Sequence, residues 1–171
     1  MKGISFSLLF VALLAVLLAS QTLYVVKETE RAVVLKFGEV VEADVRPGLH
    51  FKLPIMNEVK KFDARILTMD SRPQRYLTLE KKAVIVDSYV KWRIESVEKF
   101  YTATSGDEVI ANRVLSSRVD TGLRNQFGER TMHEVVSGER DLLMNELRDA
   151  LNLVAISELG ITIVDIRVKR I

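Results

Sequence analysis

Two histidines, His50 and His133, are the side chains in this sequence best suited to acid–base or metal chemistry, because imidazole titrates near neutral pH. His133 begins the segment HEVVS, residues 133–137, which starts like the zinc-protease motif HExxH. That motif needs a second histidine one helical turn later, and the sequence has Ser137 at that position. Because the metal would lose a ligand, the segment does not predict a zinc site.

Other signatures of catalysis are also absent from the sequence. There is no cysteine, so the chain has neither a thiol nucleophile nor a thiolate metal site. The phosphate-binding patterns GxGxxG and GxxxxGK[ST] and the nucleophile pattern GxSxG do not occur. A serine–histidine–aspartate set could be assembled from either histidine, as in any chain of this size. We therefore predict no catalytic residue, no cofactor-binding residue and no metal ligand, and the alternative from another class is a membrane-anchored hydrolase.

The start of the chain has the composition of a membrane anchor. No charged residue occurs from Ile4 to Val26, and a helix needs about 20 apolar residues to cross the hydrocarbon core. We predict an N-terminal membrane anchor at residues 1–26. The alternative is a cleaved secretory signal, but its best cleavage pair, Leu18 with Ser20, places a leucine where a small residue is preferred.

Charge excludes one class of partner and leaves the orientation of the anchor open. Residues 27–171 hold 24 of the 25 basic residues and all 23 acidic residues, so their net charge is +1. This balance gives no reason to expect a nucleic-acid partner. Lys2 and the N-terminal amine on one side of the anchor nearly balance Lys27 and Arg31 on the other, so the positive-inside rule does not decide the topology.

The rest of the chain changes from strand to helix periodicity. Alternating apolar residues predict strands at 32–38, 48–54, 58–70 and 81–94. Helices are predicted after Ser96, after Asp107 as far as Gly128, and over roughly 139–159, and residues 161–171 return to strand alternation. Strands followed by helices and a final strand predict an α+β fold. Residues 27–95 are thus predicted to be mostly strand and residues 96–171 to be rich in helix.

The segment PGLHFKLP, residues 47–54, contains one of the two histidines. Leu49, Phe51 and Leu53 share one strand face and His50 lies on the other, so we expect His50 to point to solvent, a polar surface or lipid headgroups. We expect His133 to be exposed near the start of a helix. The residues around either histidine do not specify a role for it.

An apolar loop follows this segment. Pro54 ends strand pairing and leaves Leu53, Ile55 and Met56 in a loop. In a tethered domain the nearest apolar surroundings are the bilayer, so we predict that these three residues, with Tyr24 near the end of the anchor, lie at the membrane interface. The alternative is a loop packed against the domain's own core.

Four blocks of the sequence together resemble the SPFH family (stomatin, prohibitin, flotillin, HflK/C), which is also called band 7. The blocks are VVKETERAVVLKFGEV (25–40), RPGLHFKLPIMNEVKKFDARILTMD (46–70), KKAVIVDSYVKWRIESVEKFY (81–101) and LGITIVDIRVKRI (159–171). Their combination with an N-terminal apolar segment is most similar to the bacterial HflC branch of the family.

The resemblance implies a transmembrane helix followed by an SPFH domain of two small subdomains, the first rich in strands and the second in helices. It implies a non-enzymatic scaffold in the inner (plasma) membrane, single-pass, with most of the chain in the periplasm. There it would form a hetero-oligomer with an HflK-like partner and regulate an FtsH-like membrane AAA protease. A stomatin-like organiser of membrane microdomains is the alternative. The family continues into a long charged helix after its last strand, and since this sequence ends at Ile171 we expect that coiled coil to be absent.

Overall fold

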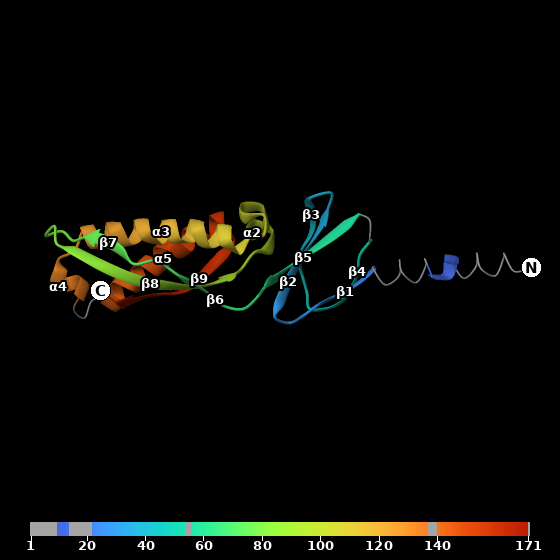
Figure 1. Cartoon of the computed structure of the whole chain (residues 1–171), viewed down its shortest axis with the longest axis horizontal. Helices are drawn as coiled ribbons and strands as arrows, with labels where there is room; N and C mark the ends of the chain where they lie inside the picture. Colours follow the sequence, from blue (N-terminus) through green and yellow to red (C-terminus); the bar gives the residue numbers. More distant parts are fainter. Residues whose placement is uncertain (1–9, 14–21, 54–55, 137–139, 171) are drawn as a thin grey trace, which may run out of the picture. The chain divides into compact units, whose positions relative to one another are not determined.

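The computed structural model describes residues 10–13, 22–53, 56–136 and 140–170, and the chain divides into two compact units at Ala64 and Arg65 (Figure 1). Most of the predicted anchor lies outside the described residues. Within the anchor, residues 10–13 are described, and they are helical. Within the described ranges, no helix is both long enough and apolar enough to cross a membrane.

Residues 23–63 of the first unit form, as far as they are described, two small antiparallel sheets. One pairs β1 (Leu23–Val26) with β4 (Gly48–Phe51), and the other has the order β3–β2–β5, formed by Glu39–Val45, Glu30–Lys36 and Asn57–Asp63. The hairpin between β2 and β3 turns at Phe37 and Gly38, whose φ angles of 52° and 88° fit a two-residue turn of the primed type. A small core of Val26, Ala32, Val34 and Val45 joins residues of both sheets.

The first unit departs from prediction in three places. Leu23–Val26 were assigned to the anchor, but they form strand β1, because two adjacent valines favour extended structure and the segment pairs with β4. Strand β3 was not predicted, because among its residues only Val45 is buried and the alternation is correspondingly weak. The predicted strand 58–70 is two strands, since β5 pairs with β2 whereas β6 (Leu67–Asp70) pairs with β8.

The second unit is one antiparallel sheet packed against helices. The long strand β8 (Ala83–Ile94) pairs with β6 and β7 (Gln74–Leu77) and also with β9 (Ile161–Arg170). In the described part of this unit the helices are α2 (Val97–Thr104), α3 (Glu108–Gly128), α4 (Met132–Val136) and α5 (Arg140–Glu158). Helix α3 packs beside β7 and α5 beside β9 (Figure 1). The predicted mixture of strands and helices is confirmed.

Alternation along β8 determines which face of this sheet meets the helices. Buried residues alternate along the strand: Val84, Val86, Ser88, Val90, Trp92 and Ile94. In the helix predicted after Asp107, which is α3, every fourth residue is buried, namely Ala111, Leu115, Val119, Leu123 and Phe127. The core of the second unit therefore lies between one face of the sheet and the inner faces of α3 and α5.

The ends of the helices in the second unit are set by capping residues. The Ser96 hydroxyl accepts from the backbone N–H of Lys99, and the Asp107 carboxylate accepts from that of Val109 at 2.7 Å. Thr131 and Glu134 form a capping box at the start of α4. Gly160 ends α5 with a φ of +64°, and a Cβ atom there would lie 2.6 Å from the Ser96 carbonyl oxygen. Any larger residue at that position would therefore displace backbone.

The division between units differs from the predicted subdomain boundary after residue 95. Strands β6, β7 and β8 belong with the helices, because β8 pairs with β9 from Asp87 to Ile94. That pairing joins segments more than sixty positions apart in the sequence, and periodicity along the chain carries no signal for it.

Tyr76 provides a test of how the sheet is fixed to α3. Its side chain is buried, and its hydroxyl donates a hydrogen bond of 3.0 Å to Asp120 Oδ1. Burial, together with the hydrogen bond and negative charge of Asp120, raises the pKa of Tyr76 well above its ordinary value. We expect Tyr76→Phe to lower the free energy of unfolding by about 1–3 kcal/mol at pH 7, because a buried hydrogen bond to a charged group is lost.

The same pKa shift predicts a pH dependence. Above a pH of about 10 the unfolded tyrosine loses its proton while the folded one keeps it, so folding loses stability as the pH rises. The difference in free energy of unfolding between the wild type and Tyr76→Phe, measured by urea denaturation, should therefore become smaller as the pH is raised from 7 to above about 10. A difference that stays constant across this range would show that the Tyr76 hydroxyl is not coupled to folding.

Candidate functional site

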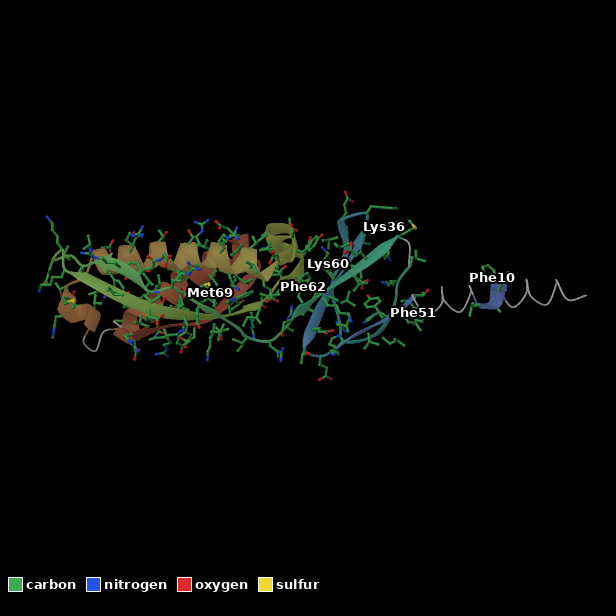
Figure 2. The ribbon with its side chains drawn as sticks, viewed as in Figure 1. Phe10, Lys36, Phe51, Lys60, Phe62 and Met69 are labelled. Carbon is green, nitrogen blue, oxygen red and sulfur yellow. The ribbon has the colours of Figure 1, made fainter. Side chains whose placement is uncertain are left out.

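The two-stranded sheet of the first unit exposes an apolar face. The pairs Leu23–Phe51 and Val25–Leu49 lie opposite each other in β1 and β4. These four residues, which we call the apolar face, are 45%, 78%, 54% and 61% exposed respectively. Phe51 lies at the end of β4 in the first unit (Figure 2). Cross-strand apolar pairs normally cover a core, so a pair of them facing outward indicates a contact surface.

The opposite face of this sheet points into the unit. Tyr24 and His50 are paired across the strands, and their rings stack with centroids 5.5 Å apart. Tyr24 also packs against the small core formed by Val26 and its neighbours. The His50 ring is half-buried, and its Nε2 atom lies 2.7 Å from the Arg46 carbonyl oxygen. Because a carbonyl only accepts, Nε2 carries the proton and His50 holds the turn before β4.

The strand predicted at 48–54 is confirmed for Gly48–Phe51, where β4 ends, but the side assigned to His50 is wrong. His50 faces inward and stacks on Tyr24, whereas Leu49 and Phe51 face outward. A period of two tells which residues share a face, and it does not tell which face is buried. The sequence prediction missed Leu23, Val25, Leu49 and Phe51 as exposed residues. The sequence did contain an indication of this. The segments 23–26 and 48–51 alternate in the same way, so that Tyr24 and His50 lie on one face of the sheet and the four apolar residues lie on the other.

Hydrogen bonds fix the sheet in place. The Lys61 ammonium of β5 donates to the Val25 carbonyl oxygen at 2.6 Å and lies 3.7 Å from the Glu30 carboxylate. The Lys52 N–H donates to the Thr22 carbonyl oxygen at 2.7 Å, which extends the pairing of β1 and β4 by one step. The apolar face is thus presented by a braced sheet.

The loop after β4 adds further apolar surface. Leu53 is 58% exposed and Met56 is 37% exposed, whereas Ile55 lies outside the described residues. The Leu53 carbonyl oxygen accepts hydrogen bonds from the N–H groups of Met56 and Asn57. Of the four residues predicted for the membrane interface, Leu53 and Met56 are thus exposed next to the apolar face, while Tyr24 lies on the opposite face of the sheet.

The two histidines considered for chemistry belong to different units. His50 belongs to the first unit, and His133 is exposed on α4 of the second. Across the described ranges, no group of three or more histidine, cysteine, aspartate or glutamate residues could hold a metal ion. The arrangement in the first unit can bury apolar surface against a partner.

Comparison with known proteins gives a consistent result. The model of the SPFH domain / Band 7 family matches residues 24–171. Protein HflC of Vibrio parahaemolyticus is 36% identical over 197 residues, covering 94% of this chain and 60% of the relative. Protein HflC of Haemophilus influenzae is 43% identical, covering 88% and 54%. The protein named Modulator of FtsH protease HflC of Escherichia coli is 40% identical, covering 85% and 46%. The chain thus spans about half the length of these curated relatives.

Proposed function

This chain belongs to the SPFH domain / Band 7 family, and from that premise we propose that it is a non-enzymatic membrane scaffold that regulates an FtsH-like protease together with an HflK-like partner. One observation carries the proposal. The family match covers residues 24–171, and a relative at 40% identity over 85% of the chain is named a modulator of FtsH protease. That name supports a regulatory role in preference to catalysis by the chain itself.

The apolar face supports the membrane part of the proposal. Leu23 and Val25 lie at the end of the uncharged run from Ile4 to Val26, so a chain anchored by the earlier part of that run would hold β1 near the bilayer. In this proposal the apolar face, with Leu53, Ile55 and Met56, rests in the membrane interface. Burying a phenylalanine or leucine side chain contributes about 1.5–3 kcal/mol, so a few such residues suffice to seat a small unit on lipid.

The proposed action is one of contact. A scaffold seated on the inner membrane and assembled into a hetero-oligomer with HflK-like subunits would limit the access of membrane substrates to the protease. The chain would span the membrane once, with most of its length on the periplasmic side. It needs no cofactor for this role, and its partners would be the bilayer and two membrane proteins.

Co-purification from membranes tests this function. The tagged full chain is expressed with an HflK-like and an FtsH-like protein, and the membranes are solubilised in mild detergent. We expect both proteins to be retained with the chain, and neither with an unrelated single-pass protein carrying the same tag. Retention of neither partner would contradict the proposal. Retention of lipid-organising proteins in their place would favour a stomatin-like role.

A further inference from the structure

A polar groove runs along α3 in the second unit, between this helix and the strands β6 and β7. Its volume is about 630 Å³, and we call it the α3 groove. Helix α3 contributes Arg113, Ser117 and Arg124 to one wall, and the connection from β6 to β7 contributes Arg72 to the other. The groove is separate from the apolar face, and the function proposed above does not use it.

The charges of the α3 groove are unbalanced. Arg72, Arg113 and Arg124 are exposed, and none of them forms an ion pair with a residue that the structure describes. The two acidic residues of the lining are already engaged. Asp70 lies 2.8 Å from the Lys169 ammonium, and Asp120 accepts the hydrogen bond from the Tyr76 hydroxyl. The groove therefore offers three guanidinium groups to a ligand and favours negative charge.

The spacing of the arginines sets the size of that ligand. Arg113, Ser117, Thr121 and Arg124 follow at intervals of four, four and three residues, so they share one face of α3. At 1.5 Å per residue, Arg113 and Arg124 lie about 16 Å apart along the helix axis. A single phosphate or carboxylate is too small to reach both arginines. The ligand must be elongated and must carry several negative charges.

The other wall of the groove favours a polypeptide. Among the described strands, β6 and β7 pair only with β8, so their outer backbone edge is available to an extended segment. The Asn112 Oδ1 atom accepts from the Trp92 indole at 3.1 Å, which leaves the Asn112 amide N–H groups free to donate. Arginine binds carboxylates through two parallel hydrogen bonds. We propose that the α3 groove binds an acidic protein segment in extended conformation.

The test uses the full chain in nanodiscs of neutral lipid and a fluorescent peptide of about six glutamates, whose extended length of about 20 Å matches the groove. Arg113→Gln/Arg124→Gln should weaken binding of this peptide by about tenfold or more, measured by fluorescence anisotropy. The matched control is Arg75→Gln/Lys81→Gln, which removes two positive charges at exposed positions outside the groove. We expect this control to change the affinity by less than about twofold.

Several results would overturn the proposal. The first is that the wild type does not bind the peptide. The second is that both double variants lose peptide affinity to the same extent. The third is that inorganic phosphate, added at the same total negative charge as the peptide, displaces the peptide fully. Loss of binding to anionic vesicles alone, with peptide binding unchanged, would assign the groove to lipid and would also reject the proposal. The thermal midpoints of both variants should equal that of the wild type, since the substituted side chains are exposed. No protease or HflK-like partner is present, so the outcome is independent of the function proposed above.

Discussion

Replacing Trp92 with alanine should lower the free energy of unfolding of the second unit by about 3–5 kcal/mol. The side chain is fully buried near the end of β8, and the centroid of its ring lies 6.1 Å from that of Phe100 on α2. Its indole N–H donates to Asn112 of α3. The substitution opens a cavity between the sheet and two helices and removes the donor of the half-buried Asn112 amide oxygen, and these two effects add.

Urea denaturation followed by far-ultraviolet circular dichroism measures this change, because Trp92 is the only tryptophan and its fluorescence is lost in the variant. Leu153→Ala on α5 is a suitable control, since Leu153 is 73% exposed. We expect the control to stay within about 0.5 kcal/mol of the wild type. A Trp92→Ala variant as stable as the control would mean that β8 is not the centre of the fold.

The double substitution Leu49→Asp/Phe51→Asp should release the apolar face from the bilayer. Burial of the wild-type Leu49 and Phe51 side chains in the membrane interface would contribute about 3–6 kcal/mol to membrane binding. Each introduced carboxylate disfavours apolar surroundings. Since the chain has no cysteine, a dye attached through Val25→Cys reports the environment of the face alone. In nanodiscs we expect quenching by lipid-bound quenchers in the wild-type background and quenching by aqueous iodide after the double substitution.

Phe37→Asp/Val41→Asp provides the matched control. These residues belong to the same unit and are 81% and 64% exposed, but they lie in the turn after β2 and in β3. We expect this variant to keep the lipid quenching of the Val25 label. If the label is quenched by iodide before any substitution, or if both double variants shift it equally, the apolar face does not contact lipid.

Strongly periodic segments could be predicted from the sequence because their pattern and their packing agree. The repeat from Ala111 to Phe127 has one residue per helical turn, and all five residues face the core. The strand 81–94 has a clear period of two, and β8 buries the residues of one parity. Ser96, Asp107 and Gly160 marked helix ends through local hydrogen bonding and backbone conformation, which neighbours in the sequence determine.

The remaining features depend on contacts between distant segments. Whether His50 or Phe51 faces inward is decided by the pairing of β4 with β1 and by the packing of Tyr24, which a single strand does not encode. The residues Leu23–Val26 are as apolar as an anchor requires, so composition alone could not identify them as a strand. The α3 groove combines residues of α3 with Arg72 from a short connection, and no motif links them.

The most direct test of the central claim is the rate at which an FtsH-like protease degrades a membrane substrate in proteoliposomes that contain an HflK-like partner. We predict that adding this chain slows degradation, that the chain alone leaves the substrate intact, and that Leu49→Asp/Phe51→Asp reduces the effect. An unchanged rate with the chain incorporated, or cleavage of the substrate by the chain alone, would contradict the account.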